Sequence, residues 1–205
     1  MSLKELFKIF SYRKSIFLFR FFYGWRLGSL GCKSIIKSPL LWTPSHIFLG
    51  DNVHIQSGCR IEGVSHWMGH RFNPQIIVED GVSIEQSCHL TAMGLLRIGR
   101  GTLITYGVMI TDIDHEYRDV DLKVLSQPIL NSLTEIGESC FIGAGAKIQA
   151  GTQLGKHCVV GANAVVRGVF PDYSVIVGVP ARVIKRFETI SKKWLKTDKY
   201  GNFLE

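Results

Sequence analysis

One histidine of this chain stands in an acidic stretch. His115 follows Asp112 and Asp114 and directly precedes Glu116. An imidazole titrates near neutral pH, so it can accept the proton of a hydroxyl group as a general base. A carboxylate or a backbone carbonyl beside the ring would fix its tautomer, and Asp112, Asp114 and Asp121 all stay open for that role. We therefore expect His115 to be a catalytic base.

Further side chains capable of binding precede this histidine. His66, Trp67 and Arg71 lie close together in the sequence, and His89 follows them. Aromatic and hydrogen-bonding groups suit a sugar, so we expect His66 and Arg71 to contact a sugar ligand. His89 should point outward beside an inward neighbour and could line the same binding site. Asp112 is a further candidate for binding this ligand.

A six-residue repeat must position these groups. Aliphatic residues recur most regularly at Ile136, Ile142, Ile148, Leu154, Val160 and Val166, and small residues follow four places after the first five. This period fits neither an α-helix nor a simple alternating strand. It is typical of a solenoid with three short faces per turn, in which each coil buries its core against its neighbours. The fold predicted is therefore all-β, a parallel β-helix.

Glycines and cysteines occupy fixed places in the repeat. Glycine follows the aliphatic position at Gly50, Gly99, Gly137, Gly143, Gly155 and Gly161, where we expect it to supply the torsions of tight corners. Four of the five cysteines, Cys59, Cys88, Cys140 and Cys158, take the small inward position. We expect buried, reduced thiols in a cytoplasmic protein, because no CxxC pair and no secretory signal is seen.

Two segments, 63–76 and 112–134, interrupt the repeat. Long loops on a regular solenoid are usually functional. We expect residues 47–185 to form the catalytic β-helix. Residues 186–205 should form a short C-terminal helix, over about 186–196, and a polar tail that cap the open end of the solenoid.

The N-terminal segment, residues 1–46, is basic and aromatic. The chain has a net charge of +7, and residues 1–40 hold eight Lys or Arg against one acid, Glu5. The remainder is neutral, which argues against a nucleic-acid partner. No apolar stretch approaches the roughly 20 residues that span a bilayer. Either this segment packs on the first coil, or residues 1–26 contact an anionic membrane at its inner face.

Three motifs together resemble the hexapeptide-repeat acyltransferases. They are ITDIDHEYRDVDLKVLSQPI, IGESCFIGAGAKIQAGTQLGKHCVVGANAVV and GVPAR. The resemblance is strongest to the galactoside, maltose and xenobiotic acetyltransferases and to the O-antigen or capsule O-acetyltransferases. It implies that the β-helix is left-handed and that three identical chains form a homotrimer. Acetyl-CoA would then meet a sugar or glycan hydroxyl in a cleft between two subunits. It also places the catalytic histidine of the family at His115.

The same resemblance implies a coenzyme site along the last coils. It assigns Ala144 and Ala162 to the pantetheine arm, with Phe141 beside them where tryptophan is commoner. Arg167 and Lys185 would bind phosphates. A backbone N–H near Phe141 would stabilise the oxyanion, and no metal is required.

Other functions of such a fold are alternatives. N-acetylation of an amino-sugar nucleotide would also need the His115 base. A zinc carbonic anhydrase needs three protein ligands, but His115 has no histidine partner at 110 or 120. Sugar-nucleotide pyrophosphorylases and serine acetyltransferases need larger N-terminal regions than residues 1–46. A membrane-attached trimeric scaffold is the non-enzymatic alternative.

Overall fold

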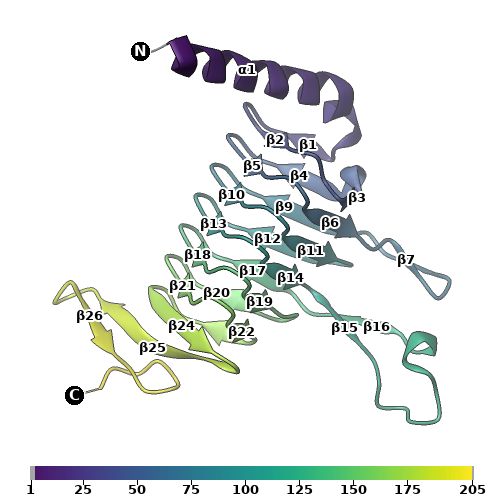
Figure 1. Cartoon of the computed structure of the whole chain (residues 1–205). Coiled ribbons are helices and arrows are strands. Elements are labelled where there is room, and N and C mark those ends of the chain that lie inside the picture. The colour runs from purple at the N-terminus through teal and green to yellow at the C-terminus, as the bar shows by residue number, and fades with distance from the viewer. Residues whose placement is uncertain (1–2, 205) are drawn as a thin grey trace.

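The chain winds into a left-handed parallel β-helix that carries one long helix across its N-terminal end (Figure 1). The computed structural model describes residues 3–204, with the side chains of residue 11 and residues 14–204. Neighbouring coils stack in register, so that Ile55, Ile84 and Ile104 lie directly over one another. The predicted all-β solenoid is confirmed.

Three parallel sheets form the faces of the solenoid. The first sheet contains β1 (Ser29–Leu30), β4 (Ile47–Leu49), β9 (Gln75–Val78), β12 (Leu95–Ile98), β17 (Thr134–Ile136), β20 (Gln153–Leu154) and β23 (Val169–Phe170). The second contains β2 (Ile35–Ile36), β5 (His54–Ile55), β10 (Ser83–Ile84), β13 (Leu103–Ile104), β18 (Phe141–Ile142), β21 (Val159–Val160) and β24 (Ser174–Gly178). The third contains β3 (Leu41–Trp42), β6 (Arg60–Gly63), β11 (His89–Ala92), β14 (Met109–Thr111), β19 (Lys147–Ile148) and β22 (Val165–Val166).

The interior follows the repeat closely. Aliphatic positions such as Ile61, Ile110 and Ile142 are completely buried. The four cysteines predicted to point inward are all buried and unpaired by disulfides. The adjacent Cys59 thiol and burial raise the pKa of Cys88, which keeps that thiol protonated and unreactive.

The reason expected for the repeat glycines is wrong. Gly137 and Gly155 do not adopt left-handed torsions; a Cβ on Gly137 would lie 2.5 Å from the carbonyl carbon of Gly155 in the next coil. These glycines are needed because stacked corners approach each other closely. The left-handed residue comes two places later, where Ser139 has a φ of 54° and His157 a φ of 57°.

The solenoid begins earlier than residue 47. The chain opens with α1 (Leu3–Tyr23) and the 3₁₀ turn η1 (Gly24–Arg26), and β1, β2 and β3 then form a complete first coil. Leu30, Ile36 and Trp42 continue the six-residue spacing. A tryptophan at the third position and the turn η2 (Pro44–His46) obscure the repeat there.

The C-terminal helix is also a wrong prediction. Residues 181–196 form β25 (Ala181–Glu188) and β26 (Lys193–Lys196), which add antiparallel to the second sheet beside β24. Burial alternates along the start of β25, where Ala181 and Val183 are buried and Arg182 is exposed. This period of two favours a strand, and pairing satisfies the backbone edge of β24 that a helix would leave open.

Two arms leave the solenoid at the same corner, between the third and first sheets. The first arm joins β6 to β9 and contains β7 (His66–Trp67) and β8 (His70–Arg71). The second joins β14 to β17 and contains β15 (Ile113–His115), the turn η3 (Val124–Ser126) and β16 (Ile129–Asn131). They correspond to the two interruptions of the repeat, and both project from the same side of the molecule (Figure 1).

Candidate active site

The two arms meet at His115. The ring of Trp67, from the first arm, lies edge-on to the imidazole of His115 with 5.6 Å between ring centroids. The indole N–H of Trp67 donates a hydrogen bond to the carbonyl of Gln127 in the second arm, at 3.2 Å. Gln127 is itself buried and its side-chain amide donates to the carbonyl of Asp119. The arms therefore support each other around an exposed histidine.

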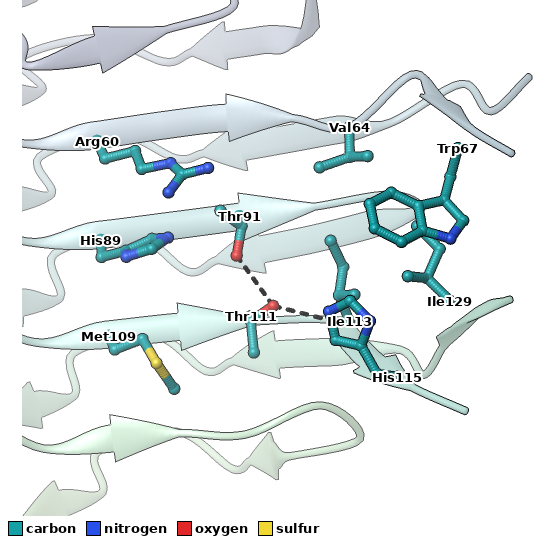
Figure 2. Close-up of a pocket in the computed structure, with 10 residues that line it drawn as sticks. All are labelled: Arg60, Val64, Trp67, His89, Thr91, Met109, Thr111, Ile113, His115 and Ile129. Carbon is teal, nitrogen blue, oxygen red and sulfur yellow. Dashed lines mark hydrogen bonds between the residues drawn. The ribbon is translucent and has the colours of Figure 1, made fainter. Parts of the chain in front are cut away.

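A cavity of about 310 Å³ opens beside this contact. It is lined by Arg60, Val64, Trp67, His89, Thr91, Met109, Thr111, Ile113, His115 and Ile129 (Figure 2). The walls come from three neighbouring strands of the third sheet and from both arms. Two imidazoles, an indole ring and two hydroxyl groups thus surround one space.

Asp112 anchors the base of the second arm. Its carboxylate is completely buried and accepts hydrogen bonds from the N–H groups of Met93 and Gly94, at 2.8 and 2.9 Å, and from the Asn131 amide at 2.8 Å. Burial raises the pKa of Asp112 despite these donors. The prediction that Asp112 binds the acceptor does not fit, because its oxygens face the interior.

The other candidate partners of His115 also point elsewhere. Asp114 pairs with Arg167 at 2.5 Å. Asp121 is exposed. Among residues 14–204, no carboxylate accepts a hydrogen bond from the His115 ring. Arg167 thus forms an exposed ion pair with the strand that carries His115, and its predicted role in binding a phosphate stays a prediction.

A column of outward side chains on adjacent strands forms the floor of the cavity. His89 lies between Arg60 and Met109, and Lys147 follows Met109 in the column but does not line the cavity. Burial, and secondly the charge of Arg60, lower the pKa of His89, which favours a neutral imidazole. Arg60 itself forms an ion pair with Glu62. The structure thus brings His89 into the same cavity as His115.

His66 and Arg71 pair with each other across the first arm and are exposed. Neither lines the cavity. Trp67 lines the cavity, which is the role that the sequence predicted for His66 and Arg71. Strand alternation explains the difference, since adjacent residues of an arm face opposite ways.

Several cavity residues escaped the sequence analysis. Arg60, Thr91, Met109 and Thr111 belong to regular strands and interrupt no pattern. The Thr91 and Thr111 hydroxyls are 3.0 Å apart, and the Thr111 hydroxyl accepts a hydrogen bond from the Ile113 N–H at 3.1 Å (Figure 2). The register of the repeat could have identified them, because each is the outward neighbour of an inward residue on the third sheet, from which both arms leave.

The residues predicted to hold the coenzyme lie elsewhere on the solenoid. Ala144 and Ala162 occupy successive corners between the second and third sheets, where the Asn163 N–H donates to the Ala144 carbonyl at 2.9 Å. Phe141 is exposed on β18, and Lys185 is exposed on β25 opposite Lys196. None of these residues lines the cavity around His115. Their coenzyme roles stay predictions.

Two general findings bear on the alternatives. Within the described part of the chain, no cluster of three or more His, Cys, Asp or Glu side chains is placed to hold a metal ion. Among the helices of residues 3–204, none has both the length and the apolarity required to cross a membrane.

Comparison with known proteins gives the class. Residues 133–168 match the family model for the bacterial transferase hexapeptide, six repeats. A protein of Escherichia coli K12 that carries the name lipopolysaccharide biosynthesis O-acetyl transferase WbbJ is 30% identical over 192 residues, covering 89% of this chain and 90% of that protein. The chain therefore belongs to the bacterial hexapeptide-repeat acetyltransferases. A Mycobacterium tuberculosis protein named as an acetyltransferase is 41% identical over 90 residues, which span 30% of that longer protein.

Solved structures support the fold. AntD, an N-acyltransferase from Bacillus cereus solved with dTDP and 3-hydroxybutyryl-CoA, superposes with a TM-score of 0.63 at 20% identity, over 91% of this chain and 88% of that one. A maltose O-acetyltransferase from Clostridium difficile 630 gives a TM-score of 0.54 at 24% identity, over 80% and 72% of the two chains. At these identities the likeness concerns the solenoid fold.

Proposed function

We propose that this acetyltransferase moves an acetyl group from acetyl-CoA to a sugar hydroxyl of a bacterial surface polysaccharide or its precursor, with His115 as the general base. The observation that carries the proposal is the single cavity in which His115 and the Trp67 ring, from two different arms, meet His89 from the solenoid. The E. coli relative, named for lipopolysaccharide O-acetylation, supports this class of acceptor.

In this mechanism His115 removes the hydroxyl proton as the oxygen attacks the thioester carbonyl. When the thiolate of CoA leaves, it takes up that proton from the imidazolium, and the free base is restored. The face of Trp67 suits the apolar face of a pyranose, and the threonine hydroxyls of the cavity suit its polar edge. We further propose that the enzyme acts in the cytoplasm as a homotrimer, in which a neighbouring subunit completes the cleft.

Acetylation of an amino-sugar nucleotide is the second candidate. Arg60, which lines the cavity, and Lys147, which follows Met109 in the same column, offer cationic groups to a diphosphate. AntD, which has the same fold, was solved with dTDP. A neutral His115 would accept a proton from an amine nucleophile just as it would from a hydroxyl.

A thiol-release assay with acetyl-CoA tests both candidates. Wild type and His115→Ala would be compared on sugars, oligosaccharide precursors and amino-sugar nucleotides. We expect His115→Ala to lose roughly 10²–10⁴-fold in turnover. His70→Ala is the matched control, because His70 is an exposed arm histidine outside the cavity.

The product identifies the acceptor. An ester is cleaved by hydroxylamine and an amide is not, so mass spectrometry before and after that treatment separates O- from N-acetylation. Full turnover by His115→Ala would exclude the base. Turnover with amino-sugar nucleotides alone would replace the first candidate by the second, and a solution mass other than three times 23.0 kDa would exclude the trimer.

A further inference from the structure

The helix α1 packs on the first coil with one side only. Phe19 is buried, and its ring lies 6.2 Å from that of Trp42 in β3. Ile16 is partly buried against the same core. The guanidinium of Arg20 donates to the carbonyl of Gly31 at 3.0 Å, which ties the helix to the coil beneath it. This side covers the end of the solenoid.

The opposite side of α1 is apolar but uncovered. Lys14, Phe17, Leu18 and Phe21 stand at positions i, i+3, i+4 and i+7, so they share a helix face. Phe17 and Phe21 are 67% and 68% exposed and stack on each other at 6.4 Å. Trp25, in the turn that follows, is 80% exposed. We call these five residues the outer face of α1.

The segment that carries the outer face holds charges of one sign. Between Glu5 and Asp51 the chain holds no acidic residue, whereas its basic residues are Lys8, Arg13, Lys14, Arg20, Arg26, Lys33 and Lys37. Of these, Lys14 is exposed on the outer face itself, and Arg20 in α1 and Arg26 in the turn that follows are exposed as well. Exposed aromatic rings among unopposed cations suit a surface that is anionic outside and apolar within.

We propose that the outer face of α1 binds the surface of an anionic lipid bilayer. Figure 1 shows α1 lying across the end of the solenoid, so a helix parallel to the bilayer leaves both arms in water. A second copy of this chain is a poorer occupant, because pairing two such faces would bring cations together with no acid between them. This inference does not depend on the acetyl-transfer reaction.

Vesicle co-sedimentation of the full chain tests the proposal. Vesicles would contain either equal parts of phosphatidylglycerol and phosphatidylcholine or phosphatidylcholine alone. We expect binding to the anionic vesicles, weakened by salt, and a loss of about tenfold or more in Phe17→Ser/Phe21→Ser. Tyr106→Ser/Tyr200→Ser is the matched control, since both tyrosines are exposed and lie outside α1.

A second measurement locates the contact. Bilayers of brominated lipid should quench the fluorescence of Trp25, and this part of the quenching should disappear in Trp25→Phe. The thermal unfolding midpoint of each variant shows that it is folded, as expected for exposed positions. The proposal is overturned if wild type ignores anionic vesicles, if Phe17→Ser/Phe21→Ser binds them equally, or if that variant changes only the oligomeric mass.

Discussion

The coils from Thr134 to Val166 and those from Arg60 to Asn131 obey the same repeat but differ in what they build. The later coils run without interruption and expose outward side chains in fixed rows. The earlier coils turn the same corner three times: by the first arm, by the short link at Met93 and Gly94, and by the second arm. The regular coils thus form continuous faces, and the cavity forms where the two arms leave such a face.

The short link between the two arms explains their geometry. It leaves the N–H groups of Met93 and Gly94 unpaired by the ladder, and Asp112 accepts both while also binding Asn131. Asp112 begins the second arm and Asn131 ends it. One buried carboxylate therefore holds both roots of the arm that carries His115.

Replacing this anchor should produce the largest effect. Asp112→Ala leaves one buried and two partly buried donors without their acceptor, so we expect a loss of about 3 kcal/mol in the free energy of unfolding. The arm should also become more sensitive to protease. Urea unfolding and limited proteolysis measure the two effects. Asp114→Ala, two residues away and partly exposed, should cost less than about 1 kcal/mol; equal losses would contradict the anchoring role.

The regular coils should respond to packing alone. Val160 is completely buried, whereas its neighbour Val159 faces outward on the same strand. Val160→Ala should cost about 2 kcal/mol, and Val159→Ala about 0.5 kcal/mol or less. Chemical denaturation measures both. Similar losses of unfolding free energy at the two positions would contradict the distinction between outward and buried positions in these coils.

The sequence predicted the solenoid because its signal is periodic. Ile136 to Val166 repeat without a gap, and the cysteines follow the same register. The first coil was missed because Trp42 replaces an aliphatic residue and a 3₁₀ turn follows. The hairpin of β25 and β26 was missed because the alternation around Ala181 and Val183 is short, and because the edge of β24 that the hairpin covers is set by the fold and not by the local sequence.

The site was predicted at the positions where the repeat breaks. Such breaks identify residues of the arms but not cavity residues that lie on regular strands. They led to His115 and the first arm, and His89 came from its outward place beside Cys88. They did not lead to Arg60 or Thr111, which break no pattern. They also could not say which carboxylate faces inward, since Asp112 and Asp114 differ only through contacts made far along the chain.

The second arm also touches the regular coils at one exposed ion pair. Arg167 follows β22 and contacts Asp114 with side chains 55% and 35% exposed. A double-mutant cycle with Asp114→Asn and Arg167→Gln should give a coupling of about 0.2–1 kcal/mol that weakens in high salt. A coupling as large as the Asp112→Ala effect would move the anchor of the arm to this pair.

The pH dependence of stability offers a finer test of the cavity floor. Burial and the charge of Arg60 lower the pKa of His89 in the folded chain. Just below the ordinary histidine pKa of about 6.5, His89 is therefore protonated in the unfolded chain but still neutral in the folded chain. The contribution of His89 is thus present above that pH and is lost as the pH falls through the lowered pKa. Urea unfolding at pH 8 and pH 5 should show a smaller acid loss in His89→Gln than in wild type. Arg60→Gln removes the second cause and keeps burial, so its acid loss should lie between them; an unchanged loss in both variants would mean that this column does not hold His89 neutral.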